Sequence, residues 1–274
     1  MTNDSEKIIS EWRPVSELRM IEENISEFGY SKKFIDENGL NGRKSPHCSN
    51  GLSGRVNFFE PIEVKEDGGE VFFRENEERK HMEEPEIFQT QYGIFNNHNN
   101  GEFISWLGKD DFYIEGNFCD MFDCGEYTYA ISNQMHMGLG LFKIVRISQN
   151  LESVVMYDNY SPDDWICLKY DGRFRNEKGY IIIASGFSEL NRNQDGERNF
   201  QDKTLLFQID NDGNCSIAQE WKVKISSPNS IAVLDGLAYF GQNKMVTRLN
   251  LSSGEITYFT NKSDAELAAL KKMF

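Results

Sequence analysis

The chain has few basic residues, few histidines and no long hydrophobic run. Its 274 residues include 44 acids against 29 Lys and Arg, which gives a formal net charge of −15 at pH 7. Nucleic acids and anionic membrane surfaces attract clustered positive charge, so neither is expected as a partner. The longest aliphatic run, at 180–184, is far too short to span a bilayer. The excess of acids leaves two explanations, solubility and the binding of a basic protein.

A secretion signal and an even set of cysteines are also missing. The N-terminal sequence MTNDSEKIISEW has neither the positively charged region nor the apolar core of a signal peptide. The cysteines are scattered and odd in number: Cys48, Cys119, Cys124, Cys167 and Cys215. We therefore expect reduced thiols and a cytoplasmic location.

The sequence contains no recognisable catalytic or metal-binding motif. It has no G-x-S-x-G nucleophile motif, and no glycine-rich phosphate loop follows a strand. Cys119 and Cys124 have no second ligand pair, and the alternation of a β-strand would place them on opposite faces. Residues 191–202 match a calcium loop only in part, which favours a long polar loop between two strands. We expect no metal and no cofactor.

Three stretches in the second half of the chain repeat one strand pattern. Each repeat has four apolar, strand-like segments, and a turn rich in Asn, Asp, Ser or Gly separates the last two. The second segments are EYTYAISN, GYIIIASG and GLAYFGQN, at residues 126–133, 179–186 and 236–243. The pattern predicts consecutive antiparallel four-stranded sheets in which these three segments occupy equivalent places.

A four-stranded unit that recurs at this interval resembles a blade of a β-propeller. The resemblance covers residues 117–261 and depends on strand order and turn chemistry, because no WD dipeptide or Asp-box signature accompanies the repeats. Residues 87–117 predict a further blade, and the strands around 55–74 are a candidate for another. The resemblance implies a mostly β fold with a small propeller of four or five blades. A β-sandwich or another meander is the alternative architecture.

Both ends of the chain carry helix patterns. In residues 14–28, Pro14 suits the first helical turn and an apolar stripe follows at helical spacing, before Gly29. Near the C-terminus, Ser263 and Glu266 form the pattern of a capping box. The sequence thus predicts three parts: a helix and loop segment at 1–54, a propeller-like β domain at 55–261 and a C-terminal helix at 262–274 packed on that domain.

Residues 60–86 form an acidic insertion within the predicted β domain. The insertion has 11 acids and 4 bases, so it contributes a large part of the net charge. A short strand is predicted at Glu70–Arg74, and the residues after it read as an exposed loop or helix. Glu77 and Glu78 are candidate binding residues in that stretch.

The first strands of the repeats carry the acids that a propeller would direct at its channel. Asp171 and Asp235 each precede a glycine, which is typical of a turn. Asp120, or Asp123 on the same strand, is then the acid expected to face inward. A glycosidase needs two carboxylates about 5–10 Å apart, and a carbohydrate-active hydrolase using channel carboxylates is the alternative function.

A second candidate binding group lies just before a first strand. Asp163 and Asp164 precede Trp165, and an aromatic side chain beside carboxylates is typical of a protein contact patch; packing between blades is the alternative role of the tryptophan. The sequence favours non-catalytic binding of a basic protein through an acidic surface. One concrete form is an immunity-type or inhibitory protein that masks its partner, because complementary charge accelerates capture.

Overall fold

The computed structural model of the chain describes residues 11–26, 61–75, 87–98, 103–107, 112–136, 139–160, 166–192, 198–225, 228 and 230–272. These residues contain twenty β-strands, one 3-10 helix and one α-helix, so the protein is mostly β, as predicted. The chain divides into two compact units, Met82–Ile225 and a second unit formed by Met1–His81 with Ser226–Phe274.

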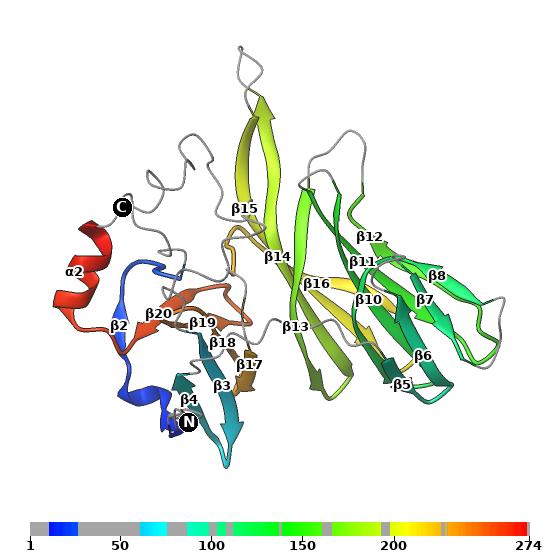
Figure 1. Cartoon of the computed structure of the whole chain (residues 1–274), viewed down its shortest axis with the longest axis horizontal. Helices are drawn as coiled ribbons and strands as arrows, with labels where there is room; N and C mark the ends of the chain where they lie inside the picture. Colours follow the sequence, from blue (N-terminus) through cyan, green and yellow to red (C-terminus); the bar gives the residue numbers. More distant parts are fainter. Residues whose placement is uncertain are drawn as a thin grey trace, which may run out of the picture. The chain divides into compact units, whose positions relative to one another are not determined.

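The unit Met82–Ile225 contains three four-stranded antiparallel sheets (Figure 1). The first consists of β5 (Ile87–Thr90), β6 (Gly93–His98), β7 (Phe103–Trp106) and β8 (Tyr113–Glu115). The second consists of β9 (Phe118–Cys124), β10 (Tyr127–His136), β11 (Leu139–Ile147) and β12 (Ser153–Asp158). The third consists of β13 (Ile166–Asn176), β14 (Gly179–Arg192), β15 (Arg198–Asp210) and β16 (Cys215–Trp221). Each strand pairs with the next along the chain, so each sheet is an up-and-down meander.

The second of these sheets is buried on both faces. One face packs on the first sheet in a cluster of Phe88, Phe95, Ile104, Ile114, Phe118, Met121, Ala130, Val145 and Ile147. The opposite face packs on the third sheet in a cluster of Phe122, Cys124, Tyr129, Ile131, Phe142, Ile144, Leu168, Ile182, Ala184, Leu205, Phe207 and Ile209. Full burial of a large apolar side chain contributes about 1.5–3 kcal/mol, which explains why successive residues of β10 are apolar.

The other unit contains a three-stranded and a five-stranded sheet. The three-stranded sheet has the order β1 (Arg13–Pro14), β4 (Glu70–Glu75) and β3 (Ile62–Asp67). The five-stranded sheet has the order β17 (Ser230–Leu234), β18 (Leu237–Gly241), β19 (Val246–Asn250), β20 (Ile256–Thr260) and β2 (Arg19–Ile21). Between them lies a cluster of Val15, Leu18, Ile62, Val64, Val71, Phe73, Ala232 and Val246.

The predicted recurrence of four-stranded sheets is confirmed. The three aligned segments form β10, β14 and β18, and each of these strands is second in its own sheet. Four of the five sheets contain four strands that are consecutive in the chain. The turn-forming residues that the sequence places between the last two strands of each repeat do connect neighbouring antiparallel strands.

The helix predicted at 14–28 is wrong for the part of it that the structure describes, which ends at Ser26. Val15–Glu17 form a single 3-10 turn, η1, and β2 follows it. Val15 and Leu18 are buried, so their apolar spacing marked core contacts rather than a helix. A short isolated helix is marginal in water, whereas pairing with β20 supplies backbone hydrogen bonds to β2.

The one α-helix in the described residues is α2 (Asp264–Lys272), which follows β20. The hydroxyl and backbone N–H of Ser263 donate to Glu266 Oε2, at 2.6 and 2.7 Å, and the N–H of Glu266 donates back to Ser263 Oγ. These hydrogen bonds form a capping box and hold the pKa of Glu266 below its usual range. No helix among the residues that the structure describes has the length and apolarity to cross a membrane.

Candidate functional site

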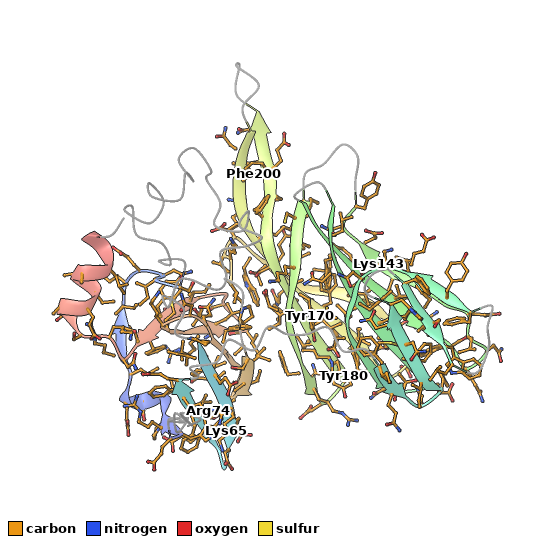
Figure 2. The ribbon with its side chains drawn as sticks, in the orientation of Figure 1. Lys65, Arg74, Lys143, Tyr170, Tyr180 and Phe200 are labelled. Atoms are coloured by element: carbon orange, nitrogen blue, oxygen red, sulfur yellow. The ribbon has the colours of Figure 1, made fainter. Side chains whose placement is uncertain are left out.

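Asp120 lies in an ion pair between β9 and β13. Its Oδ2 accepts hydrogen bonds from the hydroxyl of Tyr170, at 2.5 Å, and from Nε of Arg173, at 2.7 Å. Nη2 of Arg173 lies 3.4 Å from Oδ1. The guanidinium carbon is 4.5 Å from the ring centroid of Phe122 and 5.2 Å from that of Tyr180; Figure 2 labels the two tyrosines. Asp120 therefore joins two neighbouring sheets.

The electrostatics of this cluster fix which groups donate. Burial, followed by the charge and hydrogen bond of Asp120, raises the pKa of Tyr170, so the phenol stays protonated and donates. Burial lowers the pKa of Arg173. The hydrogen bond to Asp120 and the charge of Asp120 raise this pKa by more than burial lowers it, so it lies above its usual value. With both carboxylate oxygens held by fixed donors, Asp120 serves to connect sheets and is poorly placed to transfer protons.

Asp123, the other acid considered on this strand, is also held by fixed donors. Its Oδ2 accepts from the backbone N–H of Gln91, at 2.8 Å, and its Oδ1 from the hydroxyl of Thr128, at 2.6 Å. Gln91 lies in the turn between β5 and β6, so Asp123 ties the first sheet to the second. The two acids of β9 thus have separate structural partners.

The turn predicted at Asp171 is wrong, because this residue is a β-bulge inside β13. The pairing register of β13 with β14 shifts between Tyr170 and Gly172, which leaves Asp171 unpaired. Its side chain is 5% exposed, and Oδ2 has no hydrogen-bond partner among the described residues. Asp-Gly is a signal for bulges as well as for turns. Asp235 does occupy a tight turn, with φ of 50° between β17 and β18.

Burial dominates the titration of Asp171. It raises the pKa of this carboxyl to about 7, although hydrogen bonds from Ser185 and the charges of Lys169 and Lys224 act in the opposite direction. The hydroxyl of Ser185 also donates to the carbonyl of Ile225, at 2.9 Å, and accepts from its N–H, at 3.2 Å. The burial of this acid could not be predicted from the sequence, because strand alternation does not reveal a bulge.

The prediction that Cys119 and Cys124 face opposite sides of their strand is wrong. The register shift at Ile131 and Ser132 makes Cys119 a bulge residue, so both cysteines border the cluster between the second and third sheets. Their thiols donate to different backbone carbonyls, those of Ile131 and Asp210, each at 3.5 Å. No disulfide links the four cysteines in the described part of the chain, and no group of three metal-ligating side chains occurs there.

Asp163, Asp164 and Trp165 lie outside the described residues, but the chain on either side of them is held by one buried side chain. Asn159 Oδ1 accepts from the N–H of Phe142, at 2.5 Å, and its Nδ2 donates to the carbonyl of Ile166, at 2.9 Å. Tyr160 follows it and is 62% exposed. One amide therefore joins β11 to the first residue of β13, across the segment that carries these candidates.

The long polar loop predicted at 191–202 is wrong, because strands occupy most of it. β14 continues to Arg192 and β15 begins at Arg198, whereas the neighbouring strands stop earlier. β13 pairs with β14 only as far as Ser188, and β16 pairs with β15 only from Thr204. The outer ends of β14 and β15, residues 189–192 and 198–200, form a two-stranded ribbon that extends beyond its sheet (Figure 1). The next residues of β15, 201–203, pair with β14 but not with β16.

This ribbon carries exposed apolar side chains. Leu190, at a bulge in β14, is 60% exposed, and Phe200 of β15, labelled in Figure 2, is 47% exposed. The ring of Phe200 meets that of Phe187 edge to face, with centroids 5.0 Å apart. Because Ile166 pairs with Ser188, the segment that carries Asp163, Asp164 and Trp165 ends where the ribbon leaves its sheet.

The acidic insertion is only partly described, and Glu77 and Glu78 lie outside that part. β4, at Glu70–Glu75, is the short strand predicted there. On the β3–β4 hairpin, Arg74 pairs with Glu63 at 2.6 Å and Lys65 with Asp67 at 2.9 Å; Figure 2 labels both bases. Two acids of this hairpin, Glu63 and Asp67, are thus paired with bases of the same hairpin.

Comparison with models of known protein families gives no match, and none of the curated proteins matches the chain. The geometry alone therefore bears on function. It leaves Leu190 and Phe200 of the ribbon exposed at one end of the third sheet, and Tyr160, which follows β12 of the second sheet, is exposed as well. Asp120 and Asp123 of β9 lie elsewhere, in contacts between sheets.

Proposed function

We propose that the protein is a non-catalytic scaffold that binds a basic protein partner, built as a small β-propeller. Five sheets, four of them made of consecutive antiparallel strands, support the propeller architecture. Burial of the second sheet on both faces supports it too, because blades of a propeller pack face to face. A rigid scaffold of this kind presents the connections between its strands to a partner.

The exposed apolar side chains of the ribbon, Leu190 and Phe200, and the exposed Tyr160 support the binding proposal. Exposed aromatic and aliphatic side chains on a surface are typical of the centre of a protein interface. Asp163 and Asp164 stand in the same segment as Tyr160 and Trp165, and they supply negative charge next to those aromatic residues. A partner with basic residues around an apolar patch fits this combination, and an immunity-type protein that masks a basic toxin or enzyme is one such case.

The hydrolase alternative has less support. A glycosidase needs two carboxylates that are free to reach one substrate. Asp120 is held by Arg173 and Tyr170, and Asp123 is held by Gln91 and Thr128. These contacts assign both acids of β9 to the packing of sheets, so binding is the preferred function.

Charge reversal at the two candidate groups tests the proposal. A partner is first isolated by pull-down from the source cells, and its association rate is then measured. Asp163→Lys with Asp164→Lys should slow association by about tenfold if the segment 160–165 makes contact, because complementary charge acts mainly on the on-rate. Glu77→Lys with Glu78→Lys should do so if the acidic insertion makes contact.

A matched control carries the same change in charge at the opposite end of the third sheet. Glu126 and Glu177 are exposed in the turns after β9 and β13, so Glu126→Lys with Glu177→Lys should leave association nearly unchanged. If all three double variants bind alike, or if the partner is acidic, the acidity of the chain serves solubility and the proposal is wrong.

A further inference from the structure

The outer edge of the ribbon is a strand edge without a neighbour. Residues 198–203 of β15 pair with β14 on one side. On the other side, the pairing of β15 with β16 ends at Thr204, and no strand in the described part of the chain pairs with residues 198–203 on that side. Nζ of Lys203 is held at that boundary by Oε1 of Glu220, at 2.9 Å. The open edge is therefore 198–202, centred on Phe200. Such an edge offers backbone N–H and C=O groups to another strand.

The sequence of this edge is complementary to itself in charge. Residues 198–202 read Arg-Asn-Phe-Gln-Asp. When two such strands pair antiparallel about Phe200, position 198 of each copy lies opposite position 202 of the other, so arginine faces aspartate twice. Asn199 then faces Gln201, and the two copies of Phe200 face each other. Opposite charges directly across a strand pair stabilise it, and like charges destabilise it.

The complementarity selects one register. A shift of one residue would place Arg198 opposite either Gln201 or Lys203, and would lose both arginine–aspartate pairs. The edge of β14 is less suitable for pairing, because Leu190 forms a bulge there and bulges interrupt regular pairing. The β15 edge thus has an open backbone, a symmetric charge pattern and an apolar residue at its centre.

We propose that the protein forms a two-fold symmetric dimer in which β15 of one copy pairs antiparallel with β15 of a second copy, centred on Phe200. The pairing would join two four-stranded sheets into one continuous sheet, and a two-fold contact uses the same patch on both copies. This self-association uses the same ribbon as the binding function proposed above, but its test needs no partner.

Side-chain packing adds to the backbone pairing. Residues 200 and 202 lie on one face of β15, because strand residues alternate between faces. Phe187 lies opposite Asp202 in the β14–β15 pair, so it shares that face and contacts Phe200. The dimer brings two Phe187–Phe200 pairs together. Burial of these rings removes exposed apolar surface that the single ribbon leaves in water.

Charge swaps within the full-length chain test the dimer by sedimentation equilibrium. The wild-type chain should dimerise reversibly in the micromolar range. Asp202→Arg and Arg198→Asp, each alone, place like charges opposite one another and should raise the dissociation constant at least about tenfold. The double variant R198D/D202R restores opposite charges in the reversed order, so it should dimerise like the wild type. Asp212→Arg, an exposed reversal in the turn after β15, is the matched control and should change nothing.

A cross-link tests the register independently. Phe200→Cys places two thiols across the two-fold axis, where paired Cα atoms are about 4.5–5.5 Å apart, within disulfide range. Mild oxidation should yield a covalent dimer that Leu190→Cys and the wild type do not form. The proposal is wrong if the wild type stays monomeric up to about 100 µM, a concentration that populates a micromolar complex. It is equally wrong if the double variant remains as weak as the single variants.

Discussion

Asp171 combines an acidic side chain with nearly complete burial, and this sets a dependence of stability on pH. Its pKa is raised to about 7 in the folded chain, from an ordinary value of 3.8. The folded state therefore binds more protons than the unfolded state between these values, so this residue lowers the free energy of unfolding as pH rises from about 4 to 7. The loss is complete above pH 7.

The substitution Asp171→Asn should remove that loss. Asparagine keeps a hydrogen-bonding group for Ser185 but carries no charge, so we expect the variant to be more stable than the wild type at pH 8, by about 1–4 kcal/mol. At pH 4 the two should be similar. Urea denaturation at both pH values measures the difference, with the exposed Asp212→Asn as control. Equal stability of variant and wild type at pH 8 would contradict the assignment.

Single positions on regular strands were predicted from the sequence, but their partners were not. Asp120 was expected to face the channel of a propeller, and in the structure it is bonded to Tyr170 and Arg173 between two sheets. Arg173, its partner, comes 53 residues later, and their meeting depends on how two sheets pack. Cys119 and Asp171 were misplaced because each is the extra residue of a bulge. Alternation predicts the face of a residue only where the register is regular.

At the scale of elements, the ribbon should be dispensable for the fold. Replacing residues 189–200 by Asn-Gly joins Ser188 to Gln201, which pair across the strands, by a two-residue hairpin turn. We expect the free energy of unfolding to change by less than about 1 kcal/mol, because the backbone pairing of the ribbon is confined to its own two strands in the described part of the chain. Urea denaturation measures this change, and sedimentation should show loss of the dimer.

Ile182→Ala, in the buried part of β14, is the control for the shortened ribbon. This side chain is fully buried between sheets, so the variant should lose about 2–5 kcal/mol. A shortened ribbon that destabilises the chain as much as this core substitution would show that the ribbon supports the fold.

Two segments were predicted to have the wrong secondary structure, residues 14–28 and 191–202, and the physical reason is the same for both. The apolar spacing of Val15 and Leu18 predicted a helix. The residues that follow instead form β2, which pairs with the edge strand β20. Residues 191–202 predicted a loop because they are polar, and a ribbon that faces water on both sides needs no apolar alternation. In both cases pairing with a neighbouring strand decided the conformation.

For the molecule as a whole, the net charge of −15 should make capture of a basic partner sensitive to salt. Exposed charges are screened over about 8 Å at physiological ionic strength. The association rate should fall about tenfold between low and physiological salt, whereas the dissociation rate should change little. Stopped-flow mixing at several salt concentrations measures both. An association rate independent of salt would contradict electrostatic capture.

The repeat of four-stranded sheets was visible in the sequence because each sheet is built from neighbouring strands with their own turn residues. Strands β10, β14 and β18 each lie second in their sheets, as their alignment predicted. The surface that we propose for binding could not be predicted in the same way. This surface forms where β14 and β15 extend beyond the ends of β13 and β16. Its extent therefore depends on the lengths of all four strands.

A segment that connects two strands usually has both to hold those strands in place and to present its own side chains. The contacts of Asn159 separate these two roles. Because this buried amide holds the chain on both sides of 161–165, we expect the sheets to keep their geometry when those residues are changed. Their sequence is then free to diverge, or to be exchanged by design, while the framework persists. One protein architecture of this kind supports a series of binders that differ in a five-residue cassette and share everything else.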